Sequence, residues 1–225
     1  MDPQYESLVD SLIKDGYLKT SSIIETFKET DRADFVLSDY KTDAYVNAPL
    51  PIGFNQTISQ PLTVAFMLEL LQPKGGEKIL EIGAGSGWQT AMLGHIVGRG
   101  QSVITAEGEE IVKNVGKVVA TEIIPELKEM AETNVSKYDF IESGIIEIIL
   151  SDGSKGYKKE APYDKIISAA ASQEDVPKPW KQQLKIGGRI VSPVGNSIVV
   201  IDKISKTAYT KKEYFGFSFV PLVSE

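Results

Sequence analysis

The sequence predicts an α/β fold with a doubly wound, mostly parallel sheet and an N-terminal helical layer. From about residue 61 onward, short apolar segments alternate with segments of helical periodicity, which is typical of repeated β-α units. The apolar segment 78–82 runs into three alternating glycines and then directly into a helical pattern. At 225 residues, the chain is long enough to bury a full core in one domain spanning residues 1–225.

The first part of the chain predicts the helical layer. An apolar stripe with helical spacing indicates a helix over 4–15, and a second helix is expected over 21–29. Residues 31–40 mix aromatic with polar side chains. The proline-punctuated stretch 48–53 predicts a loop that leads toward the main sheet.

The alternating part of the chain is interpreted element by element. We expect helices over 61–71, 88–97, 125–135 and 179–184. We expect strands over 78–82, 103–106, 118–121, 145–150, 165–168 and 188–192, and further strands within 197–203 and 211–220. In a sheet of this kind a ligand binds at the carboxyl ends of the strands.

Composition excludes or disfavours several classes of function. The net charge of -7 gives no support for nucleic-acid binding, and no apolar run approaches the roughly 18 residues of a membrane span. The chain has no cysteine and one histidine, His95, so cysteine or multi-histidine metal sites and a Ser-His-Asp triad are not expected. We expect a cytoplasmic monomer without a metal.

The glycine-rich turn after residues 78–82 predicts a ligand site. Its pattern is Glu-x-Gly-x-Gly-x-Gly, whereas a dinucleotide fold shows Gly-x-Gly-x-x-Gly. The acidic Glu81 repels a phosphate but suits a ligand with ammonium and sulfonium charges, which favours S-adenosylmethionine over NAD. A purely structural turn is the alternative for such a motif.

Further segments accompany the glycine loop: Pro51-Ile52-Gly53, Gln56-Thr57-Ile58-Ser59-Gln60-Pro61, Ile124-Pro125-Glu126-Leu127, Gly153-Ser154-Lys155-Gly156-Tyr157, Ala161-Pro162-Tyr163-Asp164, Leu184-Lys185-Ile186-Gly187-Gly188-Arg189-Ile190-Val191 and Phe219-Val220-Pro221-Leu222. Together with the glycine loop, they make the chain similar to the protein-L-isoaspartate O-methyltransferases over roughly residues 4–223. The resemblance implies a Rossmann-like methyltransferase fold that uses S-adenosylmethionine. Residues 1–60 would form the helical layer and substrate loop, and 61–225 the cofactor-binding core and C-terminal strands.

The activity that the resemblance implies is protein repair. Such enzymes methylate the α-carboxyl group of L-isoaspartyl residues, and more weakly of D-aspartyl residues, in damaged proteins and peptides. Two alternatives stay open at this point. The chain could methylate another carboxylate or a small molecule, or it could bind the cofactor without catalysis.

The resemblance also assigns site residues. Ser59 matches the active-site serine and would orient the substrate carboxylate, while a cap for the helix at Pro61 is the alternative role. The residues implied to meet the cofactor are Gln56, Thr57, Ile58, Ser59, Glu81, Gly83, Ala84, Gly85, Glu122, Asp152 and Gly153. The pair Asp152-Gly153 would meet the adenine edge, although an Asp-Gly turn needs no ligand to explain it.

The acidic residue for the ribose hydroxyls has two candidates. Glu107 lies 20 positions after Gly87, which is the spacing of comparable nucleotide-binding units, and Glu122 lies 35 after it. The sequence around Glu122 matches the family better, so we choose Glu122. That choice makes residues 100–114 an insert, which is either an edge strand beside the sheet or a surface hairpin.

Two residues depart from the family pattern. Asn55 stands where glycine is common and can still adopt a positive φ angle. Leu62 stands where histidine is common and would remove an imidazole from the mouth of the site. Elsewhere, Trp88 and Trp180 are expected to be packing residues, and the charged runs 158–160 and 211–213 to be solvated turns.

Overall fold

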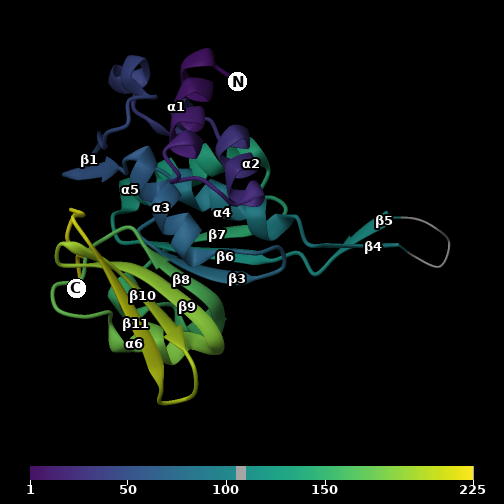
Figure 1. The fold of residues 1–225 in the computed structure, drawn as a ribbon, viewed down its shortest axis with the longest axis vertical. Helices are drawn as coiled ribbons and strands as arrows, with labels where there is room; N and C mark the ends of the chain where they lie inside the picture. Colours follow the sequence, from purple (N-terminus) through teal and green to yellow (C-terminus); the bar gives the residue numbers. More distant parts are fainter. Residues whose placement is uncertain (105–109, 225) are drawn as a thin grey trace.

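The computed structural model describes residues 1–104 and 110–224, with only the backbone described in 101–104 and 110–113 (Figure 1). A seven-stranded sheet runs through the centre in the order β11-β10-β9-β8-β3-β6-β7. Strands β9, β8, β3, β6 and β7 pair in parallel, and β10 and β11 add to one edge in antiparallel fashion. The strand bounds are β3 Lys78–Ile82, β6 Lys117–Glu122, β7 Ile146–Leu150, β8 Tyr163–Ser168, β9 Leu184–Val194, β10 Ser197–Lys203 and β11 Tyr209–Phe215.

Helices cover both faces of the sheet, as the sequence predicts for a doubly wound fold (Figure 1). On one face lie α1 Pro3–Lys14, α2 Ser21–Glu29, α3 Pro61–Leu71, α4 Trp88–Gly98 and α5 Pro125–Val135, and on the other lies α6 Lys178–Gln183. Alternate side chains of β3 point to opposite faces, so Ile79 packs in the core under α4 while Leu80 packs with α6. Short 3₁₀ helices complete the connections: η1 Arg32–Phe35, η2 Ser38–Asp43, η3 Ser136–Tyr138, η4 Gly153–Lys155 and η5 Lys158–Glu160.

The chain reverses its winding direction beside β3. From β3 it passes through α4 to β6 and through α5 to β7, and then returns to β8 on the other side of β3. Connections leave opposite faces of the sheet at this point, which opens a crevice at the carboxyl ends of the strands. The predicted helices and parallel strands are confirmed, with bounds shifted by a few residues.

One predicted loop is wrong. Residues 48–53 enter a two-stranded antiparallel hairpin formed by β1 Leu50–Gly53 and β2 Gln56–Ile58. Its turn residues Phe54 and Asn55 have φ angles of 53° and 57°, and these positive values close a tight turn. The expectation that Asn55 adopts a positive φ is therefore confirmed.

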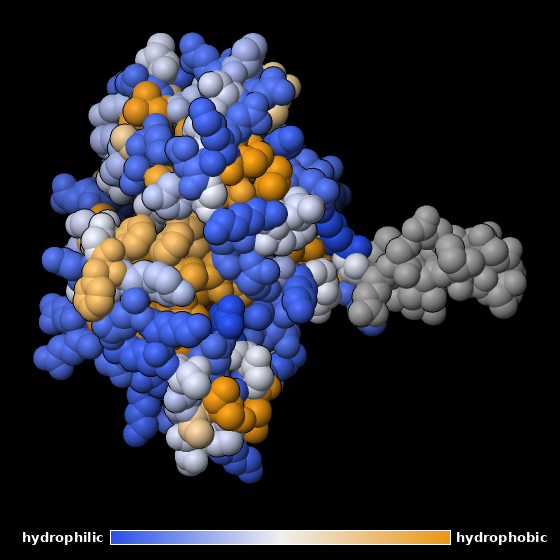
Figure 2. All heavy atoms as spheres, viewed as in Figure 1, coloured by the Kyte–Doolittle hydropathy of each residue, from blue (hydrophilic) through white to orange (hydrophobic). Residues whose placement is uncertain are grey.

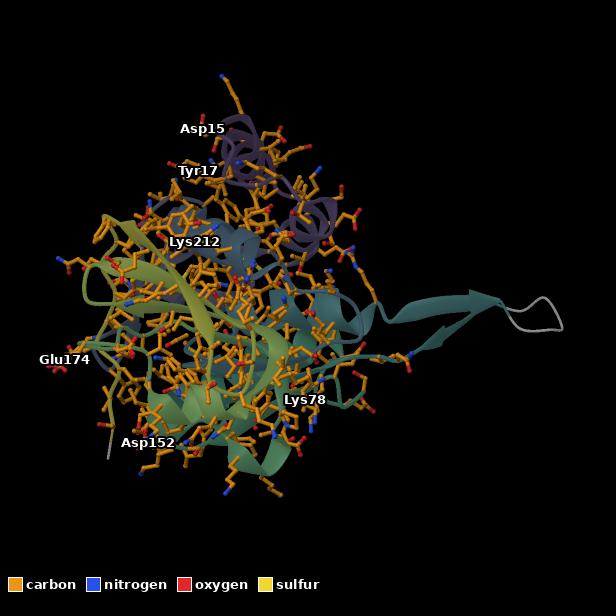
Figure 3. The ribbon with its side chains drawn as sticks, turned by 60° about the horizontal axis from the view of Figure 1, so that its bottom comes forward. Asp15, Tyr17, Lys78, Asp152, Glu174 and Lys212 are labelled. Atoms are coloured by element: carbon orange, nitrogen blue, oxygen red, sulfur yellow. The ribbon has the colours of Figure 1, made fainter. Side chains whose placement is uncertain are left out.

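The insert forms a hairpin and not an edge strand of the main sheet. β4 Gln101–Ile104 pairs with β5 Glu110–Lys113 in a separate two-stranded sheet. Figures 1 and 3 both show this hairpin projecting away from the body of the molecule. Of the expected strand 103–106, residues 105 and 106 lie outside the described residues, as does Glu107.

The last strand is shorter than predicted, and one charged run lies in it. β11 ends at Phe215 because Gly216 follows with a φ angle of +97°, which a continuing strand does not allow. Lys211, Lys212 and Glu213 are exposed residues of β11 and do not form the turn that was expected. The other run, 158–160, forms the 3₁₀ helix η5.

The two tryptophans pack in the interior, as predicted. The indole of Trp88 donates a hydrogen bond to the Thr30 carbonyl at 3.2 Å, and that of Trp180 donates to the Gly153 carbonyl at 2.8 Å. On the face shown in Figure 2, apolar residues form a band between the N-terminal layer and the C-terminal strands. Phe66 of α3 stacks on Phe217, which follows β11, with ring centroids 5.2 Å apart. Among the described residues, no helix is long and apolar enough to cross a membrane.

Candidate active site

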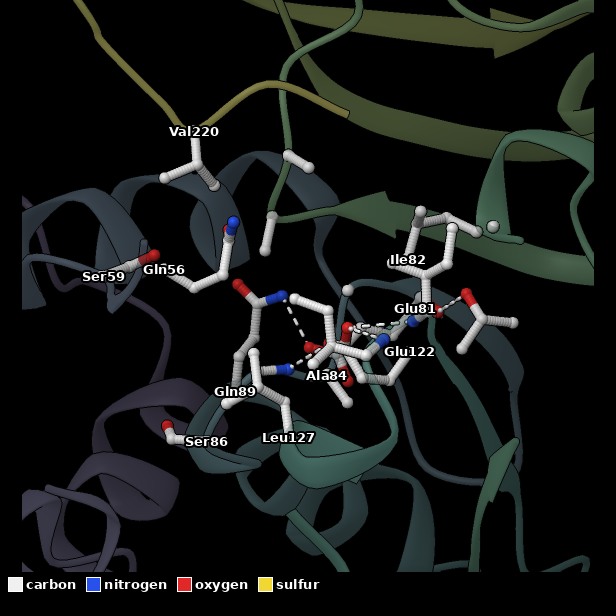
Figure 4. A pocket seen from close by; sticks show the side chains of 18 of the residues that line it. Gln56, Ser59, Glu81, Ile82, Ala84, Ser86, Gln89, Glu122, Leu127 and Val220 are labelled. Carbon is white, nitrogen blue, oxygen red and sulfur yellow. Dashed lines mark hydrogen bonds between the residues drawn. The ribbon is translucent and has the colours of Figure 1, made fainter. Parts of the chain in front are cut away.

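A pocket lies at the carboxyl ends of β3, β6, β7 and β8, where the winding direction reverses (Figure 4). Together with the open solvent at its mouth, it encloses about 840 Å³. The structure brings nearly all predicted site residues to its wall: Gln56, Thr57, Ile58, Ser59, Glu81, Gly83, Ala84, Gly85, Glu122 and Gly153. Asp152 is the exception.

The glycine loop forms the floor of this pocket. Gly83, Gly85 and Gly87 have φ angles of +84°, +55° and +87°, so all three use the backbone conformation that side chains disfavour. Gly87 has a second reason to be glycine, because a Cβ atom there would meet Val135 of α5 at 2.9 Å. The loop therefore combines an open backbone facing the pocket with a close contact to α5 behind it.

Glu81 presents a buried carboxylate to the pocket. Its side chain is fully buried, and its Oε1 accepts a hydrogen bond of 2.9 Å from the Gln89 amide. Its Oε2 is buried and has no hydrogen-bond partner among the described residues. Burial, aided by the charge of Glu122, raises the pKa of Glu81 to about 7, although the neighbouring Thr90 hydroxyl and Gln89 amide oppose this rise.

Glu122 ends β6 and organises the loop beside it. Its Oε2 accepts a 2.9 Å hydrogen bond from the Gly85 backbone N–H. Its Oε1 accepts from the backbone N–H groups of Ile123 and Ile124 at 2.9 and 3.1 Å. The carboxylate is nearly buried yet lines the pocket, so it is held in place with lone pairs left for a ligand.

Ser59 and its neighbours form the wall opposite the glycine loop. Helix α3 begins after Gln60, and its free N–H at Leu62 is capped by the Asn47 side chain at 3.0 Å. The alternative role of Ser59 as helix cap is therefore wrong. Within the described part of the chain, no hydrogen bond engages the Ser59 hydroxyl.

The backbone of Ser59 is held by a buried cation. The Arg32 guanidinium is completely buried and donates to the carbonyls of Ala44 at 2.8 Å and Ser59 at 3.1 Å. It also donates to the carbonyls of Val46 and Ala48, and it lies 5.4 Å from the ring centroid of Trp88. Burial lowers the pKa of Arg32 to about 10, so it remains charged at neutral pH.

Of the pair Asp152 and Gly153, only Gly153 lines the pocket. The Asp152 carboxylate caps η4 by accepting from the Ser154 N–H at 2.9 Å and forms an ion pair with Lys155 at 3.0 Å. Figure 3 shows Asp152 on the side of the sheet that carries α6. Gly153 does line the pocket, and a Cβ atom there would meet Ile82 at 2.6 Å.

Several lining residues were not predicted from the sequence. Gln89 comes from the first turn of α4, and Val220, Pro221, Leu222 and Val223 come from the segment after β11. The position of Gln89, two residues after Gly87 at the start of the helix, was a usable signal. The C-terminal segment is held at the pocket by Ala171, whose backbone N–H donates to the Val220 carbonyl and whose carbonyl accepts from the Leu222 N–H, both at 2.8 Å.

The departures from the family pattern lie outside the pocket wall. Leu62 packs against the main core and is not among the lining residues. His95 lies in α4 between the rings of Tyr138 and Phe140, with its Nδ1 3.2 Å from a Glu29 oxygen. The described residues contain no group of three or more potential ligands that could hold a metal ion.

Comparison with known sequences identifies close relatives. The family model described as Protein-L-isoaspartate(D-aspartate) O-methyltransferase matches residues 3–225. A protein-L-isoaspartate O-methyltransferase of Methanopyrus kandleri is 38% identical over 224 residues, covering 98% of this chain and 91% of its own. Protein-L-isoaspartate O-methyltransferase 2 of Archaeoglobus fulgidus is 40% identical over 227 residues, covering 100% and 94%.

Comparison with solved structures shows the same fold. A crystal structure from Plasmodium falciparum, described as a protein-L-isoaspartate O-methyltransferase in complex with S-adenosyl-L-homocysteine, superposes with a TM-score of 0.83 over 100% of both chains at 19% identity. A second structure of a protein-L-isoaspartate O-methyltransferase gives a TM-score of 0.79 at 24% identity, covering 96% of this chain and 65% of its own. These likenesses establish a Rossmann-like methyltransferase fold.

Proposed function

The chain belongs to the protein-L-isoaspartate(D-aspartate) O-methyltransferase family, and from that membership we propose how its residues perform the reaction. The enzyme transfers a methyl group from S-adenosylmethionine to the α-carboxyl group of L-isoaspartyl residues in damaged proteins. The observation that supports our assignment of roles is a single pocket. One wall holds a buried Glu81 carboxylate with one oxygen lacking a partner among the described residues, and the other holds Ser59, whose hydroxyl faces no described hydrogen-bond partner.

The pocket residues fit the cofactor. When bound, S-adenosylmethionine supplies an electrophilic methyl group on a positively charged sulfur. The orphaned Glu81 Oε2 offers a buried acceptor for a cationic group, which suits an amino acid ammonium better than a phosphate. Gly83 and Gly85 leave room against the backbone, and Glu122 would accept hydrogen bonds from ribose hydroxyls. Gly153 would lie against the adenine.

Ser59 would orient the substrate. A carboxylate is already ionised near pH 7, so the reaction needs no strong base, and alignment of the reacting atoms carries much of the rate. The Ser59 hydroxyl would donate a hydrogen bond to one carboxylate oxygen, which fixes the direction of attack. Thr57 and Gln56 lie beside it on β2 and would help to close the pocket against water.

The first experiment compares two peptides. Labelled S-adenosylmethionine is supplied with peptides that are identical except that one contains L-isoaspartate and the other normal L-aspartate. We expect base-labile label on the isoaspartyl peptide alone. Label on neither peptide, with cofactor binding verified by calorimetry, would contradict the proposed use of this pocket.

Ser59→Ala then tests the role of the hydroxyl. A hydrogen bond to a charged group contributes about 1.5–3 kcal/mol, so we expect kcat to fall roughly 10- to 100-fold. Cofactor affinity should change much less, because the hydroxyl acts on the substrate. Ser143→Ala, outside the pocket lining, is the matched control and should leave both values unchanged. Equal losses of kcat and cofactor affinity in Ser59→Ala would rule out a substrate-orienting role.

We further propose that the enzyme acts as a cytoplasmic monomer with one domain over residues 1–225. The absence of cysteine in the sequence is compatible with a reducing compartment. The continuous seven-stranded sheet supports one folding unit. Sedimentation of the purified protein and fractionation of its source cells test these two properties.

A further inference from the structure

The turn between β1 and β2 places a bulky residue in an unfavourable conformation. Phe54 and Asn55 have φ angles of 53° and 57°, and they connect Gly53 to its pairing partner Gln56. Asparagine and glycine accept this left-handed region readily, whereas an aromatic residue there is a genuine outlier. Phe54 therefore imposes backbone strain on the hairpin.

The ring of Phe54 is not part of the hydrophobic core. It is 52% exposed, and it belongs to neither of the hydrophobic clusters among the described residues. Phe27 and Phe35, by contrast, are completely buried. A residue that is both strained and exposed is typical of a functional position.

The position of the turn relates Phe54 to the pocket. The turn lies between two lining residues, Ile52 and Gln56, and Ser59 follows on the same segment. The Gln56 side chain approaches the Phe54 carbonyl at 3.4 Å, so the turn adjoins the wall that holds Ser59. Val223, which is 48% exposed, lines the pocket from the C-terminal segment.

We propose that Phe54 binds an apolar side chain of the substrate next to the isoaspartyl residue and so determines which damaged segments are methylated. This proposal rests on the proposed function of the pocket. A flexible ligand segment loses little by covering a rigid aromatic ring, because the ring has few torsions to immobilise. Damage can expose side chains that are buried in the folded protein, and most of those side chains are apolar. Damaged segments therefore present the apolar side chains that Phe54 would bind.

The test uses two L-isoaspartyl peptides that differ only in the residues on both sides of the isoaspartate. These residues are leucine in one peptide and serine in the other. We expect the wild-type enzyme to prefer the leucine peptide by kcat/KM. Phe54→Ala should reduce that preference roughly tenfold, mainly through KM, because it removes the apolar contact area.

Phe54→Gly separates recognition from folding. Glycine accepts a positive φ, so the midpoint of urea unfolding should rise while the preference for the leucine peptide is lost. These two effects have opposite signs, and a misfolded hairpin cannot produce them together. Phe54→Leu, which retains an apolar side chain, should keep most of the preference. Phe215→Ala is the matched control, because Phe215 is 78% exposed on β11 and is not a lining residue.

Two results would overturn the proposal. One is an unchanged ratio of the two kcat/KM values in Phe54→Ala, whether both values stay the same or both fall by the same factor. The other is a loss of preference in Phe215→Ala as large as in Phe54→Ala. If the wild-type enzyme methylates neither peptide, the proposed function itself has failed, and this outcome is distinct from an active enzyme without preference.

Discussion

At the scale of single residues, Glu81 carries the most unusual chemistry in the molecule. Its carboxylate is fully buried, and burial raises its pKa from the ordinary 4.5 to about 7. The folded enzyme without ligand therefore holds a proton on Glu81 more tightly than the unfolded chain does. Charge on this residue costs stability, and a cationic ligand would offset that cost.

This shift predicts how stability depends on pH. Between pH 4.5 and 7 the folded state retains the proton that the unfolded state has lost, so the contribution of Glu81 to stability falls as pH rises through this window. The full difference is about 3 kcal/mol. Glu81→Gln should remove this slope, as measured by urea unfolding at pH 5, 6, 7 and 8. Parallel pH profiles for wild type and variant would contradict the prediction.

Gly87 shows that one residue can serve the loop and the packing at once. Gly87→Ala forces a side chain into the left-handed region and brings its Cβ against Val135 and the Ala131 carbonyl. Strain and clash together should lower the free energy of unfolding by about 2–4 kcal/mol. Gly144→Ala is the matched control, because its φ is +73° and no atom lies within 4 Å of the added Cβ. In Gly144→Ala the free energy of unfolding should fall by about 1–2 kcal/mol. An equal fall in both variants would show that the contact with Val135 does not destabilise Gly87→Ala.

At the scale of elements, the N-terminal layer is joined to the site by Arg32. Its guanidinium donates to four carbonyls between Ala44 and Ser59, so the substrate wall depends on one buried cation. Arg32→Met leaves these acceptors without donors and should lower the free energy of unfolding by about 3–5 kcal/mol.

An exposed arginine provides the control for this prediction. Arg99 forms ion pairs with Glu25 and Glu29 near the surface, and such pairs contribute little. Arg99→Met should therefore cost less than about 1 kcal/mol. Urea unfolding of both variants measures the difference. A similar small loss in Arg32→Met would show that Ser59 is held by other contacts.

The sequence predicts the elements of the core because their patterns are local. The strand 78–82, the glycine loop and the helix after it follow from apolar periodicity and glycine spacing within a dozen residues. The β1–β2 hairpin was missed because its turn is Phe54-Asn55, whereas the recognised signals for such turns are Asn-Gly and Asp-Gly. The positive φ angle of Asn55 fits its residue type, but that of Phe54 cannot be predicted from a residue that usually avoids this region.

The site shows the same division between local and distant information. Glu122 and the glycine loop are close in structure because parallel strands end together, which the βα pattern already implies. Val220 to Val223 could not be derived from periodicity, since they reach the pocket through backbone contacts with Ala171, about 50 positions earlier in the chain. These contacts depend on the tertiary fold and leave no local pattern in the sequence.

At the scale of the whole molecule, the pocket joins segments from the N-terminal hairpin, the central sheet and the C-terminal segment. A ligand that binds only the folded state should therefore stabilise the entire chain. At a concentration of 100 times Kd, S-adenosylmethionine should add about 2.7 kcal/mol, which corresponds to a rise in Tm of roughly 5–10 °C for a chain of this length.

The control for this prediction is NAD. Its pyrophosphate would lie beside the acidic Glu81 and Glu122, so calorimetry should show no increase in Tm at the same concentration. Equal stabilisation by both ligands would mean that the pocket recognises adenosine alone.

The exposed strand β11 affects how the enzyme can interact with the chains of its substrates. Damaged proteins present extended chains whose backbone groups are free to pair, and a bare, apolar sheet edge would invite them to add as further strands. Lys211, Lys212 and Glu213 stand along that edge in water. Bringing these charges into a dry strand interface would cost their hydration. The charges on β11 therefore oppose the addition of a substrate chain to this edge of the sheet.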